Sequence, residues 1–448
     1  MRFLLFGLVI NLVLALVNIR AYRRLVAAFP IGKRAKRAIV AVQAGSLLLA
    51  TIGRLSSRTG YELPLQGAVV VALVIQLAVI ISVVLLLVFD LMNLLSRVGT
   101  RVARVIHTGW RALRHHDMAG PRPALAPRAL PEGSAGEPAG EPSEELGAVP
   151  SSGRPAAREE ISRRAFGLQL AVGSAFVVGG ASSTYGALVG RHDYVVEQVP
   201  IRIPGLKAGL DGFSIVQLSD LHIGQFVGEP ELRAAESLVR DAKPDLIVLT
   251  GDLLDHDPRF SPLLGRFVRR LQPLAKQGVA VVSGNHDYYA GIEPTLGAAR
   301  SAGARVLENA GFVIGDGSAG LAILGVNDVR AGQFEASGPD VQRALRSLPS
   351  VEGKLSRARD LPRVLLCHNP VYFEEAQAEV ALQISGHTHG GQVNLLVRPA
   401  DWLLRHGWVA GHYRVGDSQL YVNRGFGTVG PPARVGSPPE VTRFILTV

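Results

Sequence analysis

Long uncharged hydrophobic runs alternate with basic loops in the first 190 residues of the chain, a pattern typical of membrane-spanning helices. Phe3 to Ile19 is a run of 17 such residues, Ala38 to Gly53 is one of 16, and Gly67 to Phe89 is one of 23. At about 1.5 Å per residue, the third run is long enough to cross about 30 Å of hydrocarbon with some tilt. The second run contains Gln43 and Ser46, so a re-entrant or interfacial segment is the alternative there.

The run at residues 3–19 also has the length of a cleaved secretory signal. However, only Arg2 precedes the run, and no convincing small-x-small cleavage motif follows it before Tyr22. We therefore interpret it as the first of three membrane-spanning helices.

The loops between these runs predict an orientation. Residues 20–37 carry seven basic side chains and no acid, so the positive-inside rule places this loop in the cytoplasm and the amino terminus outside. Two further crossings return the chain to the cytoplasm at residues 97–114, where five arginines precede the first acid, Asp117. Their helical spacing suits an amphipathic helix lying on anionic headgroups, and a solvated helix end is the alternative.

Composition changes again beyond this basic stretch. Ala119 to Pro155 contains eight prolines and few large apolar residues, which predicts a disordered cytoplasmic tether. Arg163 and Arg164 then precede an uncharged stretch that ends at Gly190. This arrangement partly resembles a twin-arginine export signal, but an ordinary fourth span is the interpretation we favour. Both interpretations place the rest of the chain outside the cytoplasm.

The formal net charge of +10 comes from the membrane half, which carries +11, whereas the rest of the chain carries −1. Residues 1–190 hold 21 basic and 10 acidic side chains, whereas residues 191–448 hold 26 and 27. The positive-inside rule explains this excess, so nucleic acid is a disfavoured partner. The single cysteine, Cys367, excludes an intrachain disulfide and a thiolate zinc cage.

After Arg191 the pattern changes to short apolar segments that alternate with amphipathic ones, which predicts an α/β domain. The expected helices are Glu229–Asp241, Ser261–Gln277 and Pro294–Ala302. The expected strands include Tyr194–Ile203, Phe213–Leu218, Asp245–Thr250, Val279–Ser283, Arg363–Cys367, Gln419–Val422 and Val441–Leu446.

Polar residues suited to metal chemistry follow five predicted strands, where open α/β sheets place their ligand sites. Asp220 and His222 are two residues apart, so both side chains would point to one face in an extended backbone. Each motif alone is commonly a turn, a helix cap or a surface histidine, but together they point to one site. The motifs are Ser219–His222, Gly251–Asp252, Gly284–Asp287, His368–Asn369 and Gly386–Gly391.

In this order and spacing, the motifs resemble the calcineurin-like metallophosphoesterase family over residues 212–424. The resemblance implies a four-layer α-β-β-α sandwich, preceded here by a helical transmembrane region, with two metal ions at the ends of the sheets. It implies Asp220, His222 and His389 as ligands of one metal, Asn285, His368 and His387 as ligands of the other, and Asp252 as the bridging ligand.

Carboxylate, imidazole and amide ligands suit two divalent ions such as Mn²⁺, Fe²⁺ or Zn²⁺. Two such ions about 3.5–4 Å apart can polarise a phosphoryl oxygen and lower the pKa of a bridging water, which makes a hydroxide nucleophile. We expect His286 to protonate the leaving group and, as the resemblance also implies, Asp287 to orient and charge the His286 ring. Neither is expected to bind metal.

Several other residues carry less weight in the sequence. His256 and Asp257 are expected in a polar loop, with substrate contact as the alternative, and Cys367 is expected in the core. Trp402, His406 and His412 are candidates for the lip of the site.

Three further segments resemble bacterial membrane-associated phosphodiesterases of this superfamily: the strand at 194–203, Gly390–Gln392, and Asn423–Gly427 before a proline-rich tail. That branch includes enzymes that split the pyrophosphate of a diacylated UDP-glucosamine lipid precursor. Its members generally have one short leader, whereas this chain has three predicted spans and a tether.

The sequence thus predicts a dimetal phosphoesterase of the bacterial inner membrane. Its catalytic domain would lie outside the cytoplasm and hydrolyse a phosphodiester or phosphomonoester of a phosphorylated small molecule or lipid. The enzymatic alternatives are a UDP-diacylglucosamine-type pyrophosphatase, a nuclease and a cyclic-nucleotide phosphodiesterase. The non-enzymatic alternative is a membrane sensor or scaffold with an inactive phosphoesterase domain. The predicted regions are a membrane region at 1–115, a disordered linker at 116–161, a fourth membrane helix or twin-arginine-like signal at 162–190, and the catalytic domain at 191–448.

Overall fold

The computed structural model describes residues 2–59, 66–116, 162–315, 319–349 and 361–448. These residues form two compact units, one made of Met1–Val83 with Ser174–Val448 and the other of Val84–Gly173. The proline-rich tether predicted at 116–161 lies almost entirely outside the described residues.

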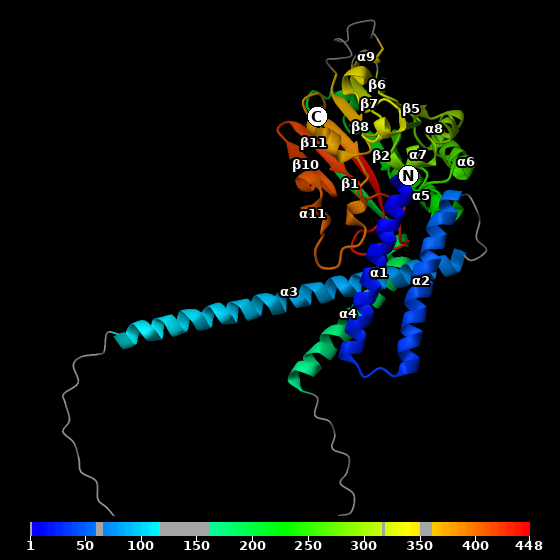
Figure 1. Ribbon diagram of the computed structural model, residues 1–448. Coiled ribbons are helices and arrows are strands. Elements are labelled where there is room, and N and C mark those ends of the chain that lie inside the picture. The colour runs from blue at the N-terminus through cyan, green and yellow to red at the C-terminus, as the bar shows by residue number, and fades with distance from the viewer. Residues whose placement is uncertain (1, 60–65, 117–161, 316–318, 350–360) are drawn as a thin grey trace, which may run out of the picture. The chain divides into compact units, whose positions relative to one another are not determined.

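The amino-terminal region is helical (Figure 1). Its helices are α1 (Arg2–Ala28), α2 (Lys33–Thr59), α3 (Gln66–His116) and α4 (Arg163–Leu188). Among the described residues, three segments are long and apolar enough to cross a membrane: Lys33–Ser56, Gln66–Thr108 and Arg163–His192. The run at 3–19 lies within α1, and its crossing of the membrane stays a prediction.

Hydrogen bonds join three of these helices through one polar side chain. Gln76 of α3 donates to the Ser46 hydroxyl of α2 at 2.7 Å and accepts from the Asn18 amide of α1 at 2.8 Å. All three residues are buried. Such pairing satisfies polar groups that would be costly to leave alone among apolar helices.

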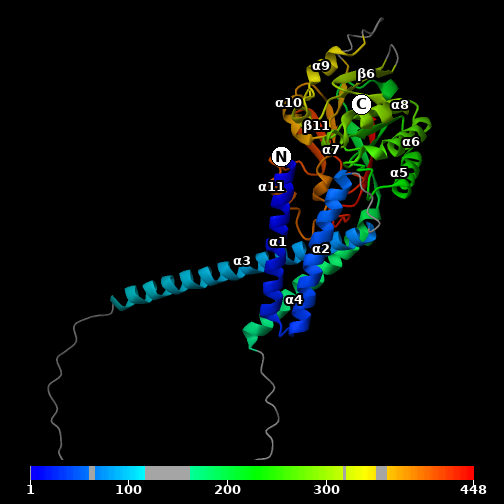
Figure 2. The same cartoon turned by 45° about the vertical axis from the view of Figure 1, so that its right-hand side comes forward.

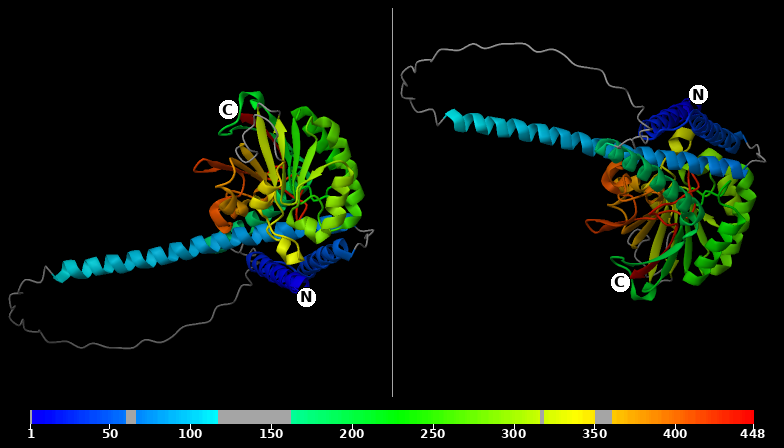
Figure 3. Two further views of the ribbon diagram at one scale, coloured as in Figure 1. Left: turned by 90° about the horizontal axis from the view of Figure 1, so that it is seen from above. Right: turned by 90° about the horizontal axis from the view of Figure 1, so that it is seen from below.

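Two six-stranded sheets form the centre of the carboxy-terminal half (Figures 1 and 3). In order, the first sheet holds β1 (Val195–Arg202), β12 (Glu440–Thr447), β2 (Ser214–Leu218), β3 (Leu246–Thr250), β4 (Val279–Val282) and β5 (Arg305–Val306). The second holds β10 (Gly411–Val415), β11 (Ser418–Val422), β9 (Leu382–Ser385), β8 (Arg363–Leu366), β7 (Gly320–Gly325) and β6 (Ala310–Gly315).

Alternating side chains of the strands build separate apolar layers. Val248 of β3 and Ile323 of β7 belong to the core between the sheets, whereas Leu249 packs in the core beneath the outer helices. Helices α5 (Glu229–Ala242), α6 (Ser261–Leu271) and α8 (Ile292–Ser301) cover the first sheet (Figure 2). The short helices α9 (Val341–Arg346) and α10 (Phe373–Ala376) are associated with the second sheet. The predicted α-β-β-α sandwich is therefore confirmed.

The predicted helix over 261–277 is too long. Helix α6 ends at Leu271, and a 3₁₀ turn follows over Gln272–Leu274. Pro273 explains the difference, because its nitrogen cannot donate the next helical hydrogen bond, although Gln272 itself still has helical backbone angles.

Strand direction places the candidate residues together. Strands β2, β3 and β4 run parallel, as do β7, β8, β9 and β11. The five motifs all follow the carboxyl ends of strands in these two groups. The fold therefore brings five distant parts of the sequence to one end of the sandwich.

Candidate metal centre

The loops that carry the candidate ligands turn through left-handed backbone. The φ angles are 53° at Asp220, 46° at His222, 51° at Asp252, 73° at His387 and 52° at His389. The expectation that Asp220 and His222 share a face of extended backbone is therefore wrong. Positive φ is uncommon outside glycine, and clusters of such strained residues are typical of functional sites.

Hydrogen bonds between loops hold this backbone in place. The Asp220 amide donates to the Gly251 carbonyl at 3.1 Å, and the His222 amide donates to the Asp252 carbonyl at 2.9 Å. The His387 amide donates to the Asp220 carboxylate at 3.0 Å. Each loop thus fixes its neighbour, which keeps the side chains in register with one another.

One group of possible ligands consists of Asp220, His222 and His389, all buried. The Nε2 atoms of His222 and His389 lie 3.0 Å apart, and His389 Nε2 lies 3.3 Å from Asp220 Oδ1. These are the three residues expected around one metal.

A second group consists of Asp252, His368 and His387. His368 Nε2 lies 3.2 Å from His387 Nδ1 and 3.3 Å from Asp252 Oδ2. The other ring nitrogen of His368 lies 2.9 Å from the Thr250 carbonyl oxygen, which can only accept, so Nδ1 carries the proton. This bond orients the ring with Nε2 toward the group, as is usual for metal-binding histidines.

Asp252 joins the two groups. Its Oδ2 atom lies 3.3 Å from His368 Nε2 and 3.6 Å from His222 Nε2. Burial alone would raise the pKa of Asp252, but the imidazoles of His368 and His286 outweigh it and hold the pKa well below its usual range. A charged carboxylate between two imidazole groups suits a shared ligand.

Asn285 supplies an independent test of whether cations fit. It begins α7 (Asn285–Ala290) and is buried, yet no described residue donates a hydrogen bond to its Oδ1 atom. A buried amide oxygen without a partner costs about 1–3 kcal/mol. A divalent cation is a suitable partner for such an oxygen, so the residues present fit a metal centre.

His286 lies beside this centre, but its partner is not the one expected. Its Nδ1 atom lies 2.9 Å from the Asp255 carbonyl oxygen and 3.3 Å from Asp255 Oδ1. Burial alone would lower the pKa of His286, but the carboxylates of Asp252 and Asp255 raise it to about 9. The ring is thus protonated at neutral pH, and Nε2 carries a proton that it can donate.

Asp287 does not orient the His286 ring, which corrects the prediction. Its carboxylate accepts hydrogen bonds from the backbone amides of Leu253, Leu254 and Gly284 at 2.8–3.1 Å. It is fully buried, and burial together with nearby Asp252 raises its pKa to about 7. Asp287 therefore holds the loop after Asp252 rather than the ring of its chain neighbour.

Two contributors were missed in the sequence. Asp255 follows Asp252 by three residues and contacts both His286 and His222, the latter at 3.4 Å. Arg434 is fully buried; its Nη2 atom lies 3.1 Å from His389 Nδ1, and it donates to four backbone carbonyls, including that of Gly427. The spacing of Asp255 within its loop was a usable signal, whereas nothing in the sequence marked Arg434.

The residues of lesser weight lie in varied places. Cys367 is in the core as expected, and Asp257 caps the turn Pro258–Phe260. The His256 ring packs edge-on against His286, with centroids 4.6 Å apart. Beyond the centre, His406 pairs with Glu374, His412 hydrogen-bonds Gln419, and Trp402 is exposed.

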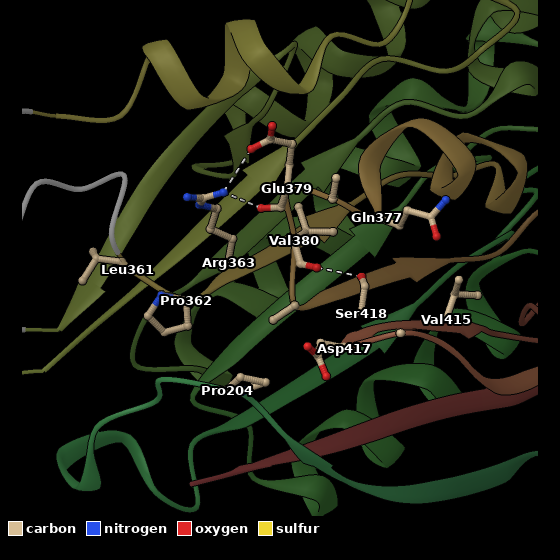
Figure 4. Close-up of a pocket in the computed structure, with 13 residues that line it drawn as sticks. Pro204, Leu361, Pro362, Arg363, Gln377, Glu379, Val380, Val415, Asp417 and Ser418 are labelled. Atoms are coloured by element: carbon tan, nitrogen blue, oxygen red, sulfur yellow. Dashed lines mark hydrogen bonds and ion pairs between the residues drawn. The ribbon is translucent and has the colours of Figure 1, made fainter.

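A cavity of about 550 Å³ lies elsewhere in the domain (Figure 4). It is bordered by the Arg363–Glu379 ion pair and by Ser418, which donates to the Val380 carbonyl. Arg363 and Ser418 begin their strands, so this cavity is at the opposite end of the second sheet from the metal centre. The residues that line this cavity are therefore not part of the metal centre.

Comparison with known proteins agrees with this geometry. The family model described as calcineurin-like phosphoesterase matches residues 213–391. The Bacillus subtilis metallophosphoesterase YkuE is 30% identical over 64% of this chain and 98% of its own length. The chain belongs to the calcineurin-like metallophosphoesterase family. As a member of this family, it is a metal-dependent phosphoric ester hydrolase.

Other metallophosphoesterases share the same region. One from Aquifex aeolicus is 31% identical over 55% of this chain and 89% of its own length. The zebrafish "Transmembrane protein with metallophosphoesterase domain" is 30% identical over 61% of this chain, which spans 62% of that relative. Relatives of this metallophosphoesterase therefore include proteins described as membrane-spanning.

Proposed function

We propose that this metallophosphoesterase is anchored in the bacterial inner membrane and hydrolyses a phosphodiester or phosphomonoester outside the cytoplasm, on a lipid or envelope component. The observation that carries the enzymatic part is the position of Asp252, within 3.6 Å of an imidazole from each of two ligand groups. The basic loops at 20–37 and 97–114 support the orientation.

Seven side chains would hold two divalent cations, each of Mn²⁺, Fe²⁺ or Zn²⁺. Asp220, His222 and His389 would hold one cation, Asn285, His368 and His387 would hold the other, and Asp252 would be shared. When bound, the cations would polarise the phosphoryl oxygen and activate water at neutral pH.

The chain's own residues act on the leaving group. His286 is protonated at neutral pH, and the Asp255 carbonyl and carboxylate fix its Nδ1 side. Nε2 is then the atom that donates a proton to the departing oxygen, a step typically worth 10²–10⁴-fold in rate. Asp287 accepts hydrogen bonds from backbone amides of the loop between Asp252 and Asp255, and these bonds keep that loop in place during turnover.

The other candidate functions fit less well. The near-neutral domain lacks the basic excess with which nucleases follow a phosphate backbone. A site outside the cytoplasm would not meet a UDP-linked lipid made inside the cell. An inactive sensor or scaffold would have lost a ligand or His286, and this chain retains all of them.

Asp252→Asn tests the mechanism, with Asp241→Asn on the exposed face of α5 as the matched control. Both full-length variants would be purified in nanodiscs, assayed with bis(p-nitrophenyl) phosphate and analysed for metal by mass spectrometry. We expect Asp252→Asn to lose hydrolysis and part of its bound metal, because the shared carboxylate is gone, while Asp241→Asn keeps both. Undiminished hydrolysis by Asp252→Asn would remove the mechanism.

A panel of phosphomonoesters, phosphodiesters and lipid pyrophosphates, tested on the wild-type chain, would identify the substrate class. Turnover restricted to nucleotide substrates would contradict the lipid or envelope assignment.

A further inference from the structure

A segment just after the metal-binding histidines exposes large apolar side chains. We call residues 393–408, which include α11 (Ala400–Leu403), the apolar loop. The exposed fractions are 93% for Leu396, 73% for Trp402 and 81% for Leu403. Val397 and Leu404 are also exposed. Large apolar side chains gathered on one short segment are typical of an interaction surface.

Both ends of the apolar loop are tied to the metal centre. The Asn394 side chain donates to the Gly390 carbonyl at 2.8 Å, one residue beyond His389. At the other end, the Thr388 hydroxyl donates to the carbonyl of Val409 at 2.5 Å. The exposed side chains are therefore presented from a fixed base beside the site.

The base of the apolar loop also contacts the chain segment that meets a candidate membrane span. The backbone N–H of Asn394 donates to the Val435 carbonyl at 2.7 Å. The backbone N–H of the neighbouring Arg434 donates to the Gly186 carbonyl at 3.1 Å. Gly186 lies in the last turn of α4, within the candidate span Arg163–His192. A Cβ atom at Gly186 would lie 2.7 Å from the Val435 side chain, so this contact is close.

The composition of the apolar loop favours contact with a lipid bilayer over contact with a soluble protein. Tryptophan and leucine are accompanied by Arg398, which pairs with Asp401 at 2.8 Å, and by Arg405, which pairs with Glu374 at 3.0 Å but leaves most of its side chain exposed. Apolar and aromatic side chains flanked by arginines are the pattern of segments that lie in the membrane interface, where the cations meet anionic headgroups.

From these contacts we infer that the apolar loop inserts into the surface of the lipid bilayer in which the chain is anchored. Leu396, Trp402 and Leu403 enter the boundary between headgroups and acyl chains, and the arginines stay at headgroup level. The inserted loop holds the His389 end of the metal centre close to the headgroups. On the proposed function, the substrate class is then a phosphorylated amphiphile embedded in the bilayer.

Tryptophan fluorescence tests the contact without depending on hydrolysis. The chain has three tryptophans, at 110, 402 and 408. Full-length W110F/W408F retains only Trp402, and W110F/W402F retains only Trp408, which packs against Phe373 and serves as the matched control. Each would be placed in nanodiscs of anionic lipid with or without bromine on the acyl chains.

Brominated lipid should quench most of the Trp402 emission and little of the Trp408 emission. Acrylamide in the water should quench Trp402 less in nanodiscs than in urea-unfolded chain. Trp402 that brominated lipid leaves unquenched would overturn the inference. If that unquenched Trp402 is also shielded from acrylamide, the occupant is a protein, such as a second copy of the chain.

Hydrolysis supplies a second arm. The variant L396S/L403S should hydrolyse soluble bis(p-nitrophenyl) phosphate at the wild-type rate but lose most activity on phosphatidyl-p-nitrophenol embedded in the bilayer. V415S, at an exposed position of β10, should keep both activities. Equal rates of L396S/L403S and wild type on the embedded ester would contradict the substrate class. Absence of both activities in wild type would instead refute the proposed function, and the fluorescence result would still decide the contact.

Discussion

Two acidic residues near His286, Asp255 and Asp287, have different roles in the site. Asp255 lies three residues after Asp252, Asp287 belongs to the motif Gly284–Asp287, and of the two only Asp255 reaches the His286 ring, at 3.3 Å. The Asp287 carboxylate instead accepts hydrogen bonds from three backbone amides of the loops around Asp252. One acid therefore charges the proton donor, and the other shapes the loop that carries the shared ligand.

The proton-donor role predicts a dependence on the leaving group. We expect His286→Gln to slow hydrolysis of an alkyl phosphodiester by about 10²–10⁴-fold, because an alkoxide needs a proton as it departs. Hydrolysis of the p-nitrophenyl diester should fall far less, since nitrophenolate leaves without one. Steady-state rates on both substrates check this, with His412→Gln, whose ring hydrogen-bonds Gln419 on the neighbouring strand, as the control.

A double-mutant cycle extends the same prediction to Asp255. If Asp255 acts through His286, then Asp255→Asn should add little to the loss already caused by His286→Gln. Additive losses would show that Asp255 does not act through His286, and equal losses on the two substrates would show that His286 is not the proton donor.

Residue identity was predictable where the chemistry of the side chain was unusual for its place. The resemblance carried by the strand-end motifs implied seven ligands, and the structure gathers six of them into two groups, while the oxygen of the seventh, Asn285, is buried without a hydrogen-bond partner among the described residues. The partner of His286 was not predictable from chain adjacency, because helix α7 directs Asp287 back toward its own amino-terminal cap at Gly284. Arg434 was missed because its role depends on carbonyls brought together only by folding.

At the scale of elements, close backbone packing at the strand ends sets the positions of the ligands. A Cβ atom at Gly386 would lie 1.9 Å from the Ser219 hydroxyl and 2.3 Å from Asp220 Oδ2. One at Gly284 would lie 2.3 Å from the Asp252 backbone nitrogen. Glycine is therefore required where strands from different parts of the chain converge on the site.

Gly386→Ala tests this packing. The added methyl should displace Asp220, so that bound metal, hydrolysis and the melting temperature all fall. Gly297→Ala in α8 is the matched control, because a Cβ there meets nothing within 4 Å. It should stabilise the protein by about 0.5–1 kcal/mol through helix propensity alone. Metal analysis and thermal unfolding check both, and a Gly386→Ala protein with full metal content would contradict the packing argument.

The elements themselves were largely predictable, since their apolar periodicity is strong. The expected strand at 245–250 differs from β3 by one residue, whereas the helix expected to reach Gln277 ends at Leu271, two residues before Pro273. Local backbone at the strand ends could not be predicted, because the left-handed turns at Asp220 and His222 are imposed by bonds from the Gly251 loop.

At the scale of the molecule, charge and hydropathy separate the chain into two halves with different solvents. The basic excess lies among the apolar helices, and the domain that carries the metal centre is almost neutral. One short connection, a 3₁₀ turn at Gly190–His192, joins α4 to β1. The side of the membrane on which α4 ends therefore decides the side on which the enzyme works.

Fusion reporters on the full chain decide that side. Alkaline phosphatase folds only outside the cytoplasm, where its disulfides form, so a fusion after Gly190 should be active. A fluorescent protein inserted within residues 120–150 should glow, because the basic loop at 97–114 keeps that stretch in the cytoplasm. The reverse pair of signals would place the metal centre in the cytoplasm. A UDP-linked lipid would then become an accessible substrate, and the apolar loop would meet the inner leaflet instead of the outer one.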